Sequence, residues 1–136
     1  MPSFSKVACI LLAVMDLGVG WPNVFNSASQ LRDVFGVRGD LSPIALHCCG
    51  IIGVQTIFHG VAFLWAASSV PSVRKAMHLC NIVSLPFSAF VQLNAPLNTP
   101  PPQLAKMEMP WPILAIQLGL SLFSLVLTEK AKPKGA

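Results

Sequence analysis

Long apolar stretches, separated by short polar or proline-rich breaks, dominate this sequence. They run over about residues 5–21, 43–67, 76–93 and 111–128. A helix needs about 20 residues to cross a bilayer and about 17 suffice, so each stretch is long enough for one span. The pattern predicts an all-α integral membrane protein, a four-transmembrane-helix bundle in which residues 1–136 form a single domain.

Within each stretch, polar or small residues recur at helical spacing and share one face. In the first stretch these residues are Cys9 and Asp16, and in the fourth they are Gln117, Ser121, Ser124 and Thr128. The second stretch has a polar face of Cys48, Gln55 and His59 beside a small-residue face of Ala45, Cys49, Gly53, Thr56 and Gly60. The third has Asn81, Ser88 and Gln92, with Ser84 beside them. Helices in lipid associate through close backbone approach and interhelical hydrogen bonds. We therefore expect these faces to lie inside the bundle or against a partner protein.

The first stretch also allows a second interpretation. Lys6 followed by the apolar run 7–15 is typical of a secretory signal peptide, and Gly18-Val19-Gly20 fits its cleavage site. A carboxylate between these two regions is atypical of a signal, and Asp16 lies there. We expect residues 1–20 to be retained as a span, with a cleaved signal as the alternative.

The breaks predict where the helices end. The sequence Trp21-Pro22-Asn23 is expected to end the first helix, and residues 22–42 to form a short amphipathic segment on the membrane face. Residues 68–75 are expected to be a loop. Residues 94–110, which include Pro96 and Pro100-Pro101-Pro102, are expected to be extended, because proline lacks an amide donor and restricts the preceding residue.

Composition supports a membrane environment. Charged residues make up 10% of the chain and hydrophobic residues 54%, whereas about 25% of an ordinary soluble domain is charged. A small soluble domain has much surface for its volume and needs more charge to cover it. The net charge of +4 is spread along the chain without a basic stripe or a stacking platform, which argues against nucleic-acid binding.

The cations also predict orientation, because Lys and Arg accumulate on the cytoplasmic side of membrane proteins. With four spans, one side carries Lys6, Arg74, Lys75, Lys130, Lys132 and Lys134, and the other carries Arg32, Arg38 and Lys106. Both termini are therefore expected on the cytosolic or matrix-like side.

The strongest candidate for chemistry is Asp16, because a carboxylate at the centre of a span costs about 2.5–3.5 kcal/mol by insertion scales and needs a partner. Counting helical rise from the ends of the stretches puts Asp16, His47 and Gln117 within about 9 Å of the same interface. Asp16 and His47 would form a catalytic acid–base pair, with Gln117 as a polar clamp. The alternative is a purely structural hydrogen-bond cluster.

His59 and His78 support a different hypothesis. The same counting places them close in depth near the opposite interface, and two histidines on facing helices are typical axial ligands of haem. They are the candidate residues for a haem- or pigment-binding subunit. A zinc site is not expected, since no four-ligand set is present, and the leading interpretation includes no bound cofactor.

No catalytic or nucleotide-binding motif occurs in the chain. The leading expectation is a non-catalytic accessory or assembly subunit that packs against other membrane-protein subunits, in an organellar inner membrane. The first alternative is a membrane-embedded enzyme that acts on a lipophilic small molecule, such as a sterol, terpenoid, polyketide or quinone. An endoplasmic-reticulum membrane would suit that enzyme.

Overall fold

The computed structural model describes residues 3–98 and 111–130, with the side chains of 3–86 and 111–127. All regular structure in these ranges is helical, as the sequence predicts. The elements are α1 (Phe4–Phe25), α2 (Ser27–Ser29), the π-helix η1 (Gln30–Val34), α3 (Pro43–Ser68), α4 (Pro71–Asn98) and α5 (Trp111–Lys130). The predicted polar residues Ser88, Gln92 and Thr128 fall outside the described side chains.

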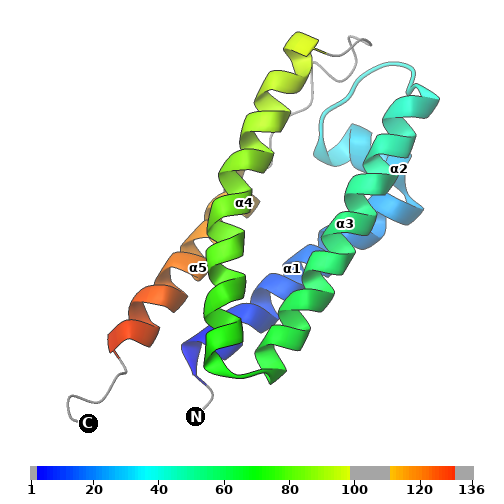
Figure 1. Cartoon of the computed structure of the whole chain (residues 1–136). Helices are drawn as coiled ribbons and strands as arrows, with labels where there is room; N and C mark the ends of the chain where they lie inside the picture. The colour runs from blue at the N-terminus through cyan, green and yellow to red at the C-terminus, as the bar shows by residue number, and fades with distance from the viewer. Residues whose placement is uncertain (1–2, 99–110, 131–136) are drawn as a thin grey trace.

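Two antiparallel helix pairs make up the fold (Figure 1). Helices α1 and α3 pack along each other, and α4 and α5 form a second pair against the first half of α1. The start of α1, the turn between α3 and α4, and the end of α5 lie at one end of the molecule. From that turn, α3 and α4 diverge toward the other end.

Side-chain caps and prolines define the helix starts. Ser3 Oγ accepts a hydrogen bond from the Lys6 amide at 3.4 Å, and Ser42 Oγ accepts one from the Ala45 amide at 3.1 Å. Pro43 and Pro71 occupy the first positions of α3 and α4, where the fixed φ of proline suits a helix. The prediction of a loop over 68–75 is therefore wrong, since residues 69–70 alone separate the two helices.

Two predicted helix ends are also wrong. Helix α1 continues through Pro22 to Phe25, and α4 continues through Pro96 to Asn98, so residues 94–98 are helical rather than extended. Proline removes one hydrogen bond of the helix ladder. In α1, the turn that follows Pro22 packs against α3, where Asn23 is buried next to Gly53. This packing stabilises the continued helix. The remainder of the predicted extended segment, residues 99–110, lies outside the described residues.

Glycines bring α1 and α3 into backbone contact. A Cβ added to Gly53 would lie 2.8 Å from the Gly20 carbonyl oxygen, and one added to Gly60 would lie 3.1 Å from the Ala13 carbonyl oxygen. Both distances are shorter than ordinary van der Waals contact, so only glycine fits without movement. The prediction that the small-residue face of the second stretch is a helix contact is confirmed.

The segment between α1 and α3 folds onto the start of α3. Leu31, Phe35 and Val37 are buried against Ala45 and Cys49, while the charged residues of the segment are exposed. The chain turns here through two glycines with positive φ, Gly36 at 65° and Gly39 at 94°, a conformation that other residues rarely adopt. The segment is thus amphipathic, and its apolar side faces α3.

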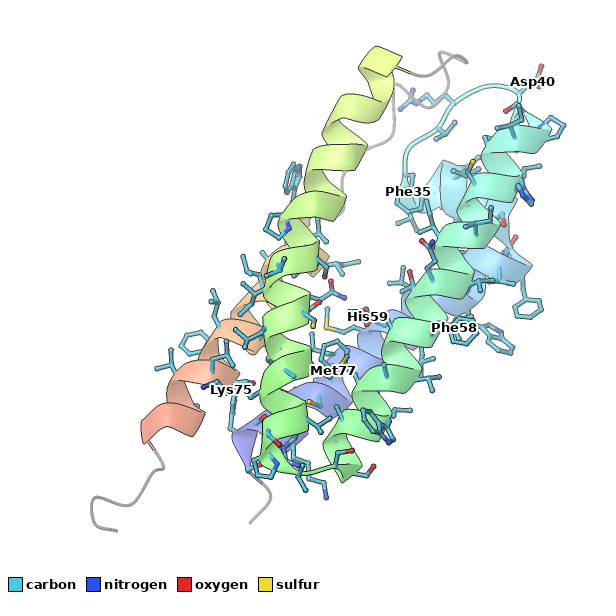
Figure 2. All side chains as sticks on the ribbon, in the orientation of Figure 1. Phe35, Asp40, Phe58, His59, Lys75 and Met77 are labelled. Carbon is cyan, nitrogen blue, oxygen red and sulfur yellow. The ribbon has the colours of Figure 1, made fainter. Side chains whose placement is uncertain are left out.

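Polar side chains are buried between the helices beside an apolar core, and many large apolar side chains are exposed. Large apolar side chains such as Phe58 project outward from the helices (Figure 2). The polar residues Asp16, Asn81, Gln117, Ser121 and Ser124 are buried. Within the described residues, α1 and α3 are long and apolar enough to cross a membrane, and α5 contains a shorter apolar stretch, Trp111–Leu127. Helices α1 and α3 are therefore candidate membrane spans.

Candidate functional site

Asp16 is the centre of a polar cluster that joins three helices. It lies just past the middle of α1 and is 2% exposed. Its Oδ1 accepts a hydrogen bond of 2.6 Å from Nε2 of Gln117 on α5, and its Oδ2 lies 2.9 Å from Nδ1 of His59 on α3. The His59 contact is close but poorly aligned, so Oδ2 has no hydrogen bond of good geometry within the described chain.

The close helix packing explains how His59 reaches the carboxylate. Gly60, the next residue, faces Asp16 so closely that an added Cβ would lie 3.2 Å from the Asp16 Cβ. Without a side chain at Gly60, α3 approaches α1 at this level, and the imidazole of His59 reaches around to Oδ2. The pairing thus depends on a glycine one residue away.

A second polar cluster surrounds His78 on α4, whose side chain is 0% exposed. Its Nε2 lies 3.4 Å from Cys9 Sγ and 3.4 Å from the Ser5 carbonyl oxygen, both on α1, and its Nδ1 lies 3.4 Å from Ser121 Oγ on α5. Asn81 Nδ2 donates to the same Ser121 oxygen at 2.8 Å. The cluster ties α4 and α5 to the first half of α1.

Phe63 contacts both histidines. Its ring centroid lies 4.8 Å from that of His59 and 5.9 Å from that of His78. Both ring nitrogens of His78 already have polar neighbours. A haem or pigment ligated by His59 and His78 would have to displace Phe63 and break those contacts, so the geometry does not favour a shared cofactor. In the described part of the chain, no three His, Cys, Asp or Glu residues form a metal-binding group.

His47 lies away from Asp16. It is exposed on the first part of α3 and lines a shallow groove of about 430 Å³ together with Ser27, Gly50 and Gln55. His59 follows it by 12 residues, or about 18 Å along the helix axis. Of the three residues predicted to meet, Asp16 and Gln117 are in contact. The third, His47, is replaced beside Asp16 by His59.

Asp16 lies beside His59 rather than the predicted His47 because α1 and α3 are offset along their axes. Asp16 and His47 would meet only if Trp21 and Pro43 lay at the same level along the two helices. Instead Gly20 faces Gly53, and the first ten residues of α3 pack against the 26–42 segment. The sequence does contain a usable signal: Ala13 and Gly20 on α1 have the same spacing as Gly53 and Gly60 on α3. Matching these small residues in antiparallel register brings residues 57–60 next to Asp16.

Comparison of the chain with known protein families, with curated proteins and with solved structures finds no match to any of them. What the site can do chemically is therefore inferred from its geometry.

That geometry suits proton transfer. Oδ2 of Asp16 lies 2.9 Å from Nδ1 of His59, close enough for the carboxylate to stabilise a protonated imidazole by charge. Nε2 of His59 has no hydrogen-bond partner in the described part of the chain, and the side chain is 34% exposed. Figure 2 shows His59 on the side of α3 that faces α4, where these two helices diverge. A proton acceptor thus adjoins a fully buried carboxylate.

Proposed function

We propose that all four long helices cross a membrane and that the chain is a multi-pass membrane protein. Helices α1, α3, α4 and α5 contain 22, 26, 28 and 20 residues, and at 1.5 Å per residue even 20 residues extend about 30 Å, the thickness of the hydrocarbon core. The outward apolar and inward polar side chains support this arrangement, because lipid does not solvate polar groups.

Within that bundle, the proposed function is acid–base catalysis on a lipophilic small molecule. The contact between Asp16 and His59 carries this proposal, since a buried carboxylate beside a partly exposed imidazole is the arrangement that proton transfer needs. Nε2 of His59 is the proposed base that takes a proton from a hydroxyl or an acidic C–H group of the substrate. The apolar outer surface allows such a molecule to approach from the lipid.

The other two residues have supporting roles. The Asp16 carboxylate stabilises the imidazolium that forms when His59 takes the proton. Gln117, whose Nε2 donates to Asp16 Oδ1, holds the carboxylate so that Oδ2 faces the imidazole. A sterol, terpenoid, polyketide or quinone has the required apolar body and few polar groups, and an endoplasmic-reticulum membrane suits such a substrate.

A second candidate function is a non-catalytic accessory or assembly subunit of a larger complex in an organellar inner membrane. One observation favours it: neither the cavity beside Asn23 nor the groove beside His47 is lined by Asp16 or His59. Asp16, His59 and Gln117 would then serve only to hold α1, α3 and α5 together. Under either function, Lys6, Arg74 and Lys75 at the end where α1 begins support cytosolic or matrix-like termini.

Substitution of the two histidines separates these functions. Cells that lack the gene are complemented with wild type, Asp16→Asn, His59→Gln or His47→Gln, and their apolar extracts are compared by mass spectrometry at matched protein levels. If the site is catalytic, Asp16→Asn and His59→Gln give the extract of the null cells, whereas His47→Gln gives that of wild type.

The outcome that contradicts catalysis is equally specific. If all three variants restore the wild-type extract at wild-type abundance, Asp16 and His59 have no chemical role. Native separation of the protein in mild detergent then tests the accessory function, which requires migration within a larger complex of fixed composition.

A further inference from the structure

The outer face of α1, opposite its buried face, is apolar along the whole helix. Its residues recur at alternating intervals of four and three, which places them on one line along a helix. They are Val7, Leu11, Val14, Gly18, Trp21 and Phe25, and all of them are exposed. Lipid covers an apolar face as well as a protein does, so the apolar character alone indicates no partner.

One backbone group on this face lacks a hydrogen bond. Pro22 lies inside α1 and has no N–H group, so the Gly18 carbonyl loses the bond that residue 22 would otherwise donate. An added Cβ at Gly18 would meet nothing within 4 Å, so no side chain of the described residues covers the helix at this point. Lipid offers no donor, and an unpaired carbonyl there is costly.

Trp21, one turn later on the same face, carries a suitable donor. Within the described chain its ring packs on Phe25, at a centroid distance of 4.5 Å, and its indole N–H makes no hydrogen bond. Side chains of a helix lean toward its N-terminus, whereas its carbonyl groups point toward its C-terminus. An indole at the level of residue 21 on a parallel neighbouring helix would therefore lean toward the carbonyl of residue 18.

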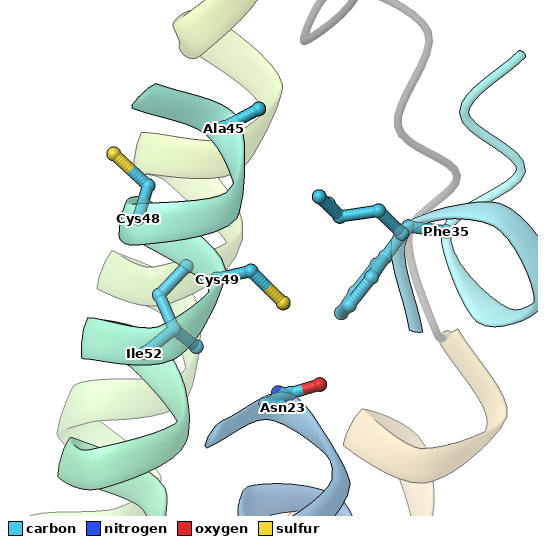
Figure 3. Close-up of a pocket in the computed structure, with 7 residues that line it drawn as sticks. Asn23, Phe35, Ala45, Cys48, Cys49 and Ile52 are labelled. Atoms are coloured by element: carbon cyan, nitrogen blue, oxygen red, sulfur yellow. The ribbon is translucent and has the colours of Figure 1, made fainter. Parts of the chain in front are cut away.

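The last turn of α1 is held in place from its other side. There Asn23 faces the start of α3 and the Phe35 ring (Figure 3). An added Cβ at Gly53 would lie 2.7 Å from the Asn23 Cβ, so the turn packs closely on α3. Trp21 is nearly opposite Asn23 around the helix, so this packing presents the indole outward.

We propose that the outer face of α1 binds the same face of a second copy of the chain, in parallel and with Gly18 at the point of closest approach. The Trp21 indole of each copy donates to the Gly18 carbonyl of the other. A donor and an acceptor one turn apart on one face are self-complementary, as a two-fold symmetric interface requires. The missing side chain at Gly18 lets the two backbones approach. This inference rests on the proposed membrane crossing of α1 and is independent of the proposed catalysis.

Energy transfer between two dyes measures this association. Full-length chains with a donor or an acceptor dye at the C-terminus are mixed in phosphatidylcholine vesicles, and the vesicles are diluted with lipid. We expect transfer that rises linearly with the acceptor fraction, as for a dimer. Trp21→Phe removes the indole donor, and Pro22→Ala gives the Gly18 carbonyl its own intrahelical donor. Each change removes both symmetry-related hydrogen bonds and should weaken association about tenfold.

A matched control and a combined variant complete the test. Trp65→Phe changes a tryptophan of α3 that is 61% exposed, as Trp21 is, and should leave association unchanged. Trp21→Phe combined with Pro22→Ala should associate as weakly as either single variant, because all three lack the same bond. The proposal is overturned if Trp65→Phe weakens association as much as Trp21→Phe, or if the combined effect is the product of the two single effects.

Flotation with the vesicles after a carbonate wash separates the two proposals. A chain that does not float contradicts the membrane crossing and the dimer with it. A chain that floats without energy transfer overturns the dimer alone, since lipid or a different protein then covers this face.

Discussion

Gly53→Ala tests whether the backbone contact between α1 and α3 holds the molecule together. An added Cβ would lie 2.7 Å from the Asn23 Cβ and 2.8 Å from both the Gly20 carbonyl oxygen and Val24 Cγ2. The carbonyl belongs to the backbone of α1 and cannot rotate away. Ordinary contact begins at 3.4 Å, so the two helices must separate by about 0.6–0.7 Å at this point.

The size of the expected change in the free energy of unfolding follows from that separation. A gap of about 0.6–0.7 Å forfeits between about a quarter and a half of the dispersion energy of each contacting atom pair, and overpacking of this kind typically costs about 1–3 kcal/mol. The gain in helix propensity from Gly to Ala, about 1 kcal/mol, offsets part of the cost. We expect Gly53→Ala to lower the free energy of unfolding by up to about 2 kcal/mol, and to be less stable than Gly18→Ala by about 1–3 kcal/mol, because both variants gain the same helix propensity.

The assay is unfolding in mixed micelles of increasing SDS content, followed by far-ultraviolet circular dichroism. Gly18→Ala is the matched control, because an added Cβ there meets nothing within 4 Å, and it is expected to leave stability unchanged or to raise it. Gly20→Ala acts at the same contact, so the double variant should cost less than the two single variants together. Equal stability of Gly53→Ala and Gly18→Ala would refute the reasoning.

Three further substitutions test other contacts by the same unfolding assay. His78→Ala leaves Ser121 without its imidazole neighbour and creates a cavity, so we expect a loss of about 2–4 kcal/mol, and a loss below about 1 kcal/mol would contradict a structural role for the His78 cluster. Leu31→Ala removes a buried side chain of η1 and should cost about 2–4 kcal/mol, whereas Val34→Ala, which is exposed on the same segment, should cost less than about 0.5 kcal/mol; equal effects would show that the segment does not pack on α3. Ser42→Ala removes the cap of α3 and should cost about 1 kcal/mol, which Ser42→Asp should largely restore if capping is the cause.

Much of the helical architecture follows from local pattern. The predicted stretches 43–67 and 111–128 match α3 and α5 within two residues, because apolar length and terminal prolines act locally. The ends at Pro22 and Pro96 could not be read in this way, since a proline weakens a helix by a fixed local amount and tertiary packing decides whether the helix continues.

In the candidate site, too, local pattern predicts some features and tertiary packing decides the others. Helical periodicity identifies Asp16 and Gln117 as inward-facing, and the structure joins them. Helical periodicity does not identify which histidine contacts Asp16, because that depends on how far α3 is displaced along α1.

The sequence by itself determined which residues share a helix face, because rotation by about 100° per residue is a property of every α-helix. Asp16, Asn81 and Gln117 are buried as this pattern predicts, whereas Gln55 and Ser84, which it also placed inside, are exposed. It also determined the low charge and the apolar outer surfaces of α1 and α3. The tertiary structure alone decided the axial register, through the fit of Gly20 against Gly53 and of Ala13 against Gly60. That register selects His59 rather than His47 as the neighbour of Asp16, since a helix can slide along its partner without changing which face it presents.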